Sequence, residues 1–504
     1  MEFGIDYNRT FGLHKTTALI LYNQSKYYSP SLQYYVPNAY QGLVGRLTYE
    51  YASRYLAEFN MGYNGTENFA KGKRFGFFPA VSLGWVISEE KFFPKNNIVK
   101  YLKVRGSYGE VGNDQIGGDR FLYLPSSYGA ASDSGVNKYN FGLASNPYTS
   151  LMIVENKIGN PDLTWEKAKK MNVGVDINLF NNCLTASFDI FKEKRNNILA
   201  NRSTSPMIIG ANLPAYNFGE MENRGWEMDL NFRHHIQDFH YWARFNYSFA
   251  RNEIIYMDEV QKRYDYQMTT GRRKNQFFGL IFDGYYNSWE EINALDRPKS
   301  SWSGNQLQPG DVKYVDVNQD GVIDDYDMVP IGYTPVPEII YGFSFGAQYK
   351  GFDFSILFQG ADNVSIKYFG RSMWPFAKGE ESAKSLIKER WTQERYEAGE
   401  KITFPRLSLN PNGETDHNYR PSTLWIRDAR YLRLKNLEVG YTFTGGFVKR
   451  LNLNSVRLYF NGSNLFTWTD VVDLDPEAPS RSGNVEINTY PLQKVYNIGL
   501  NINF

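Results

Sequence analysis

Alternation of apolar and polar residues is the feature that most constrains this chain. At the C-terminus the apolar positions are Tyr496, Ile498, Leu500, Ile502 and Phe504, and asparagine or glycine fills each position between them. A β-strand points successive side chains to opposite faces, so this period of two predicts a strand with one apolar and one polar face. The same pattern flanks Asn181-Asn182 and Lys350-Gly351. These residues favour tight hairpin turns because asparagine and glycine tolerate a positive φ.

About fifteen segments show the pattern, and many reach the ~9–11 residues that a tilted membrane strand requires. We expect strands at 2–12, 14–24, 42–51, 55–64, 76–88, 101–110, 165–180, 183–195, 221–233, 240–251, 339–349, 352–360, 430–443, 454–468 and 491–504.

The links between these segments alternate in length. Short links lie near 13, 53, 89–100, 181, 236, 350 and 444–453, and long links lie at 25–41, 65–75, 111–164, 196–220, 252–338, 361–429 and 469–490. Outer-membrane barrels show this asymmetry because their periplasmic turns are short and their extracellular loops are long. The pattern therefore predicts an all-β chain that forms part of a transmembrane antiparallel β-barrel. A soluble sandwich with one wet face produces the same alternation and stays an alternative.

Composition removes several other classes of protein. The mean hydropathy of −0.51 and the lack of a long apolar run exclude a transmembrane helix, but they leave a barrel open because its strands are half polar. Lysine and arginine number 55 and aspartate and glutamate 54, a balance that argues against nucleic-acid binding. A single Cys183 excludes a disulfide framework. No catalytic or nucleotide-binding motif is found, so we do not expect an enzyme.

Residues 316–327 form the sharpest local motif, DVNQDGVIDDYD. Oxygen ligands at alternate positions of a tight loop suit calcium, and a glycine at the sixth position permits the bend. The predicted ligands are Asp316, Asn318, Asp320, the carbonyl of Val322, Asp324 and Asp327. The last ligand is aspartate where glutamate is usual, and no helix pair flanks the loop. We expect a structural calcium ion here; the alternative is an aspartate-rich turn without an ion.

Aromatic residues in the long links are the other functional hint. Trp289, Trp302 and Trp374 lie outside the expected strands. Aromatic faces stack on sugar rings, so these residues could line a substrate site; the alternative is packing inside the loops or an interfacial belt. Residues 378–396 are expected to form a helix.

Several phrases in the chain resemble the SusC/RagA-type TonB-dependent outer-membrane transporters of Bacteroidetes. They include FPAVSLGW at 78–85, LKVRGSYG at 102–109, NPDLTWE at 160–166 and NRGWE at 223–227. Further along come Gly310-Asp311, Arg390-Trp391-Thr392, Pro405-Arg406, DARYLRLKN at 428–436, NGSNLFT at 461–467, Asp475-Pro476-Glu477 and the terminal Phe504. They follow the family order along nearly the whole chain.

The resemblance implies import of glycans, or of other oligomers such as peptides, through a barrel of 22 strands with a plugged lumen. It also implies a SusD-like lipoprotein partner over the external loops and energy from TonB–ExbB–ExbD through the plug. The residues after Met1 show no signal-peptide pattern, and no plug is recognised. We therefore expect residues 1–504 to be the C-terminal part of the receptor barrel, contributing about fifteen strands.

Two other functions compete with this interpretation. One is a secreted, β-rich, calcium-stabilised glycan-binding protein or glycosidase. The other is a passive porin of about sixteen strands. An exterior stripe of phenylalanine and tyrosine separates the first from an importer, because a soluble protein with such a stripe would aggregate.

Overall fold

The structure of the protein is a computed structural model, and the account below concerns the residues that it describes. These are 1–29, 36–115, 120–124, 129–130, 138–143, 148–151, 153–154, 158–204, 213–302, 306–368, 374–376, 385–408, 416–472, 474–477, 484–485 and 491–504.

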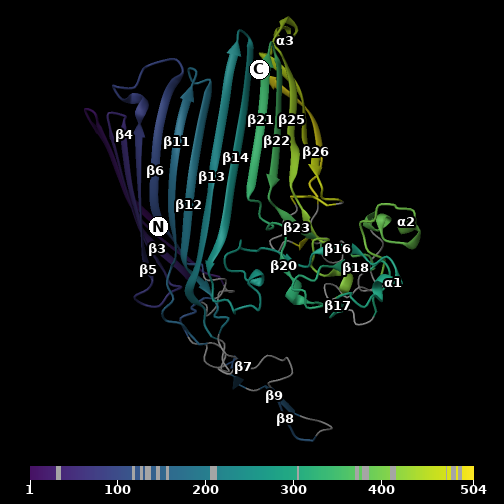
Figure 1. The fold of residues 1–504 in the computed structure, drawn as a ribbon. Coiled ribbons are helices and arrows are strands. Elements are labelled where there is room, and N and C mark those ends of the chain that lie inside the picture. The colour runs from purple at the N-terminus through teal and green to yellow at the C-terminus, as the bar shows by residue number, and fades with distance from the viewer. Residues whose placement is uncertain are drawn as a thin grey trace. The chain divides into compact units, whose positions relative to one another are not determined.

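One antiparallel sheet of fifteen strands dominates the fold (Figure 1). In order across the sheet the strands are β1 (Glu2–Phe11), β2 (His14–Tyr27), β3 (Asn38–Tyr51), β4 (Tyr55–Thr66), β5 (Phe75–Val86), β6 (Val99–Asn113), β11 (Glu166–Leu179), β12 (Leu184–Ala200), β13 (Tyr216–Ile236), β14 (Phe239–Tyr256), β21 (Ile339–Tyr349), β22 (Phe352–Asp362), β25 (Tyr431–Phe443), β26 (Ser455–Thr469) and β28 (Val495–Asn503). Each of the fifteen expected strands has a counterpart, and the all-β prediction is confirmed.

Short and long links alternate along the sheet, as expected. The links at 12–13, 52–54, 180–183, 237–238 and 350–351 are short turns, whereas those at 114–165, 257–338 and 363–430 are long. The link at 67–74 is an exception, because it is shorter than 87–98, which the parity places among the short turns. At the 350–351 turn Lys350 and Gly351 have φ values of 47° and 93°, which matches the hairpin chemistry expected there.

The chain divides into two compact units, and each is described by itself. The first comprises 1–179, 188–225 and 252–260, and the second comprises 180–187, 226–251 and 261–504. In the first unit Phe69, Phe78, Leu122, Leu163 and Trp165 form a small buried cluster. Trp165 belongs to the NPDLTWE phrase and Phe78 to the FPAVSLGW phrase, and their rings lie 5.2 Å apart. These two phrases therefore meet in one core.

In the second unit, short elements of the long links gather at one end of the strands (Figure 1). They include β15 (Phe278–Gly279), β16 (Phe282–Tyr285), α1 (Trp289–Ile292), β17 (Lys299–Ser300), β18 (Val312–Tyr314), β19 (Val322–Ile323), β20 (Val329–Pro330), β23 (Ser365–Tyr368), α2 (Gln393–Glu397), β24 (Ile426–Asp428) and β27 (Asn484–Val485). At the other end lie α3 (Gly446–Arg450) and the carbonyl of Phe504, which accepts a hydrogen bond from the Asn454 amide.

The helix expected over 378–396 is wrong in its described part. A 3-10 turn covers Ser385–Glu389 and α2 begins after Thr392, whereas 378–384 lie outside the described residues. The backbone amide of Trp391 donates to the carbonyl of Phe404 at 2.8 Å, and this long-range pairing interrupts the helix. Thr392 then caps α2 by accepting from the Arg395 amide. Among the described residues no helix has the length and apolar character needed to cross a membrane.

Candidate functional site

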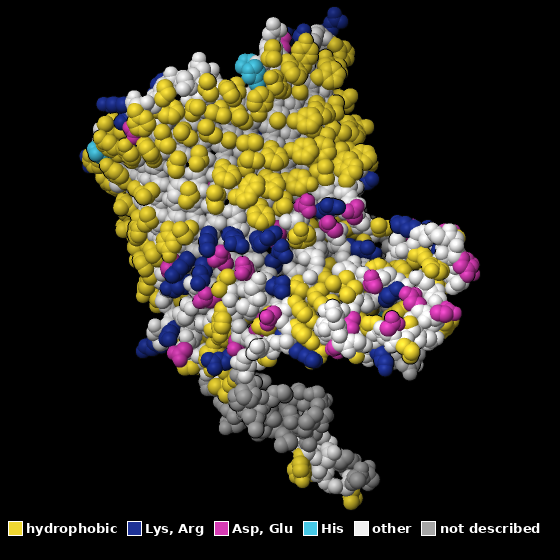
Figure 2. Space-filling view, viewed as in Figure 1, with side chains coloured by type: hydrophobic (Ala, Val, Ile, Leu, Met, Phe, Trp, Pro, Cys, Tyr) yellow, Lys and Arg dark blue, Asp and Glu magenta, His cyan; other side chains and the backbone are white. Residues whose placement is uncertain are grey.

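The strands of the second unit carry continuous apolar rows on one face. One row crosses five strands through the cross-strand partners Tyr349, Phe352, Tyr441, Leu458 and Leu500. The next row contains Ala347, Phe354, Val439, Phe460 and Ile498. Directly opposed residues share a face of a sheet, and Ile498 is 81% exposed, so these rows form a surface rather than a core. Figure 2 shows hydrophobic side chains spread over the strands, with charged side chains gathered over the links.

The opposite face of the same strands is polar and charged. Arg457 on β26 pairs with Asp353 on β22, with Nε 3.0 Å from Oδ1, and also with Glu438 on β25. Asn461 donates to the same Glu438. Asp353 and Glu438 alternate in sequence with Phe354 and Val439 of the apolar row, so each strand separates the two surfaces.

The first unit also has a charged face. The guanidinium of Arg105 on β6 binds Asp176 on β11 at 3.1 Å and Asp189 on β12 at 2.6 Å. Gly174 lies beneath this cluster, and a Cβ there would come within 2.5 Å of the Asp189 carboxylate. A hollow of about 410 Å³ opens beside Arg105, and Lys15, Glu58 and Lys103 also line it. Within this unit, therefore, charged groups of both signs and polar groups form a hydrated surface.

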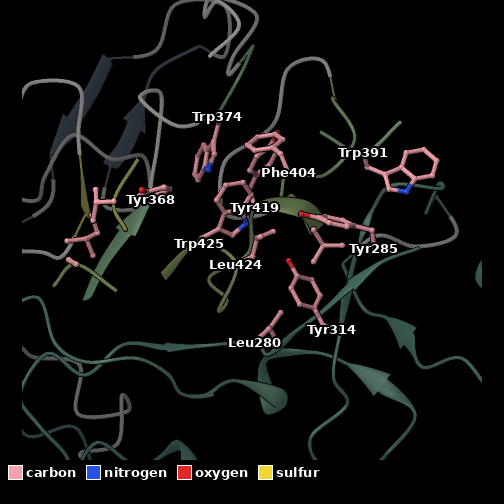
Figure 3. Packing of buried hydrophobic residues seen from close by; sticks show 14 of the residues in the cluster. Leu280, Tyr285, Tyr314, Tyr368, Trp374, Trp391, Phe404, Tyr419, Leu424 and Trp425 are labelled. Carbon is pink, nitrogen blue, oxygen red and sulfur yellow. The ribbon is translucent and has the colours of Figure 1, made fainter. Parts of the chain in front are cut away.

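The long links of the second unit fold around a core of their own (Figure 3). Its members come from the links before β21 and before β25, and include Leu280, Val312, Tyr314, Trp374, Phe404, Tyr419, Leu424 and Trp425. Trp425 donates its indole hydrogen to the carbonyl of Asn418 at 2.8 Å. The external segments are thus a packed structure with defined positions for their polar groups.

A buried polar cluster joins the two links at this core. The carboxylate of Asp311 forms an ion pair with Arg406 at 2.6 Å and accepts from the amide of Asn418 at 2.8 Å. Gly310 precedes it with a φ of 92°, and a Cβ there would meet the Trp391 ring at 2.4 Å. Glycine is required for both reasons. The phrases Gly310-Asp311, Arg390-Trp391-Thr392 and Pro405-Arg406 therefore converge on one joint.

The three tryptophans proposed for substrate contact lie in different environments. Trp374 is only 5% exposed and packs 5.4 Å from Tyr419 in the loop core (Figure 3), a position that favours packing over stacking on a ligand. Trp302 packs partly against the same core, and the guanidinium of Arg420 lies 4.0 Å above its ring. Trp289 is 55% exposed at the start of α1 and is not a member of the core. A substrate role for these residues stays a prediction.

The predicted calcium loop folds as a tight turn in which backbone amides surround the carboxylates. Asp316 accepts from the amides of Gln319 and Gly321 at 2.7 and 2.8 Å, and Asp320 accepts from Val322 at 3.0 Å. Asp327 is fully buried and accepts from Val317 at 2.8 Å and Asp324 at 2.8 Å. Gly321, at the sixth position, has a φ of 82°, as the sharp bend requires.

The donor set fits calcium in kind, because all six proposed ligands supply oxygen. Burial raises the pKa of Asp327, and the nearby Asp316 carboxylate raises it further against the lowering effect of the backbone amides. Across the described part of the chain, no three His, Cys, Asp or Glu side chains are grouped as metal ligands. Calcium binding at Asp316, Asn318, Asp320, Val322, Asp324 and Asp327 stays a prediction.

One network was not foreseen from the residues taken singly. Arg433 on β25 binds Asp475 and Glu477, and Lys435 binds Glu477 at 2.9 Å. The available signal was that DARYLRLKN and Asp475-Pro476-Glu477 both recur among the family phrases. Their spatial pairing, however, required the fold.

Comparison with known families decides the relationship of this chain. The model of the TonB dependent receptor-like β-barrel family matches residues 2–465. The chain belongs to this family. As a TonB-dependent receptor chain it is an outer-membrane protein, and the predicted class and location are confirmed.

The relatives of this receptor chain are receptors rather than enzymes. The TonB-dependent receptor P3 of Formosa agariphila is 28% identical over 479 residues, covering 91% of this chain and 45% of the relative. The TonB-dependent receptor SusC of Bacteroides thetaiotaomicron is 28% identical over 477 residues, covering 94% of this chain and 44% of the relative. The chain therefore spans less than half the length of these two relatives.

Solved structures show the same fold. A structure of the RagAB peptide transporter matches all of this chain and 55% of its own, with a TM-score of 0.73 at 22% identity. The RagAB peptide importer in a closed-closed state matches with a TM-score of 0.74 at 21% identity. The SusC/RagA resemblance seen in the sequence phrases is confirmed. That this chain is the C-terminal part of a longer receptor stays a prediction.

Proposed function

We propose that this receptor chain forms part of an outer-membrane importer for nutrient oligomers, either glycans or peptides. The observation that carries the proposal is the pair of apolar rows across β21 to β28, backed by the Arg457–Asp353–Glu438 face. Such a wall is suited to lipid on one side and a polar lumen on the other. A secreted glycan-binding protein or glycosidase would leave these rows in water, where they would promote aggregation.

The proposed transport is a conformational process rather than a chemical reaction. A SusD-like lipoprotein would close over the folded external links, and TonB–ExbB–ExbD would supply energy through a plug. The names of SusC and of the RagAB peptide importer support this partnership and leave glycan and peptide as the two substrate classes. The compact loop core around Tyr419 and Trp425 offers such a partner a rigid surface.

Two measurements test the proposal in the native bacterium. Fractionation should recover the receptor in the outer membrane, and affinity purification in mild detergent should recover a surface lipoprotein with it. Deletion of the gene should abolish uptake of one of two fluorescent probes, an oligosaccharide pool or an oligopeptide pool. Recovery of the chain in the detergent-free soluble fraction would contradict the proposal.

A further inference from the structure

A row of alternating aromatic and charged side chains lies beside the Asp316 loop in the second unit. We call it the aromatic ridge, and it consists of Trp302, Arg420, Asp325, Tyr326, Arg263 and Tyr264. The residues come from three separate stretches of the chain, 263–264, 302–326 and 420. Tertiary folding alone brings them together.

Successive members of the aromatic ridge contact one another. At one end, the Arg420 guanidinium lies 4.0 Å from the Trp302 ring centre and 3.8 Å from the Asp325 carboxylate. Tyr326 follows Asp325 directly. At the other end, the Arg263 guanidinium lies 5.0 Å from the ring of Tyr326 and 5.4 Å from that of Tyr264.

The middle and one end of the aromatic ridge are open to solvent. Tyr326 is 40% exposed, the Asp325 side chain is 74% exposed, and Arg263 is exposed. This exposure sets the ridge apart from Trp374, whose ring is enclosed in the loop core. The ridge therefore presents ring surface together with a guanidinium and a carboxylate.

Hydrogen bonds beneath the aromatic ridge hold its backbone. Tyr266 donates its hydroxyl to the carbonyl of Tyr326 at 2.7 Å, and the Gln267 amide donates to the carbonyl of Asp325 at 2.8 Å. Asp324 and Asp327 cap the same 3-10 turn from both sides. A surface fixed in this way loses little conformational entropy when a ligand binds.

We propose that the aromatic ridge is a carbohydrate-binding subsite. Flat tyrosine and tryptophan faces offer stacking surface to the apolar side of a sugar ring. The guanidinium of Arg263 and the carboxylate of Asp325 offer planar pairs of donors and acceptors for neighbouring hydroxyl groups. A row that alternates the two chemistries suits an oligosaccharide, which presents apolar ring faces and polar edges along its length.

The ridge is poorly suited to a peptide. Peptides are commonly held along the edge of a sheet or in an apolar groove. No ridge residue belongs to a strand of the described structure, and the aromatic rings are separated by charged groups. The inference rests on the proposed function in one respect, since import brings oligomers to these external segments and narrows its two substrate classes to glycan.

The test uses the native receptor purified in detergent and an array of neutral and acidic oligosaccharides. We expect binding to at least one array glycan, followed by calorimetry with that glycan. Tyr326→Ala and Arg263→Gln should each weaken binding by about tenfold, a loss in the range of one aromatic or charged contact. Tyr396→Ala is the matched control, because this exposed tyrosine lies on α2 outside the ridge and should leave affinity unchanged.

Three outcomes would overturn the inference. They are the absence of binding to any glycan on the array, an affinity unchanged by Tyr326→Ala and Arg263→Gln, and binding of a hexapeptide library that Tyr326→Ala abolishes. Thermal unfolding of each variant checks that the fold is retained. Because the assay measures binding in detergent, its failure is distinct from failure of the proposed function, which appears as loss of outer-membrane location or uptake.

Discussion

The guanidinium of Arg433 lies 2.6 Å from the carboxylate of Asp475, and this ion pair is buried. Arg433 stands on β25, whereas Asp475 belongs to the segment between β26 and β28. Asp475 also accepts from the backbone amides of Glu477 and Leu492, each at 2.9 Å. The pair therefore attaches both described ends of this segment to the strand wall.

Loss of Arg433 should release this segment. Arg433→Gln leaves the Asp475 carboxylate without its charged partner, and breaking such a buried pair costs about 3–5 kcal/mol. We expect faster proteolysis near 474–477 and 491–492, read by mass spectrometry of the receptor in detergent. Arg430→Gln is the control, because Arg430 pairs with Asp428 and Asp470 at an exposed position and should cost less than about 1 kcal/mol. Equal proteolysis of both variants would show that the buried network does not anchor the segment.

The two faces of β28 should respond oppositely to a charge. Ile498→Arg places a cation in an apolar row and should lower the free energy of unfolding in bilayers by about 2–4 kcal/mol. Asn497→Arg, one residue away and opposite Asn461, should change it by less than about 0.5 kcal/mol. Denaturant titration in lipid vesicles measures both values. Similar losses for the two variants would contradict the assignment of the apolar face to lipid.

The Asp316 loop should bind calcium with an affinity that depends on its carboxylates. Asp316→Asn keeps an acceptor for the loop amides but removes a charge, so we expect about tenfold weaker binding in calorimetry. Asp296→Ala is the control, since Asp296 is an exposed aspartate outside the loop. Crystals grown in calcium that show no density between Asp316, Asn318 and Asp320 would rule out the site.

Acid should loosen the loop core through His417. This ring lies between Ser300 and the Val312 carbonyl, close to Tyr314, Asp311, Asp416 and Arg420. Burial lowers the pKa of His417 below its ordinary 6.5, against the raising effect of the Val312 carbonyl and the two aspartates. The folded state therefore disfavours the proton. The stability that depends on neutral His417 is present above the ordinary pKa and is lost as the pH falls from there through the lowered value.

Hydrogen exchange measures this effect. The amides of Val312 and Tyr314 should exchange faster as the pH is lowered below about 6, after correction for the intrinsic rate. The neutral variant His417→Gln should reduce that dependence, whereas His240→Gln at the β13–β14 turn should leave it intact. An unchanged pH profile in His417→Gln would assign the effect to another group.

Much of the wall could be predicted because strand formation and facing depend on neighbouring residues. Phe354 and Val439 were expected on one face from alternation alone, and cross-strand pairing places them opposite each other. The helix over 378–396 failed because the pairing of Trp391 with Phe404 interrupts it, and no local pattern reveals a partner thirteen positions away. The aromatic ridge escaped for the same reason, since Arg420 and Trp302 are distant along the chain.

The sequence by itself determined the strands, their two faces, the alternation of link lengths and the family phrases. Each depends on side-chain period or on residues adjacent in the chain. Only the tertiary structure decided that Trp374 is buried, that Asp311 meets Arg406, and that Arg433 attaches Asp475. The long links carry no regular period, so the positions of their side chains follow from packing and ion pairs between distant segments.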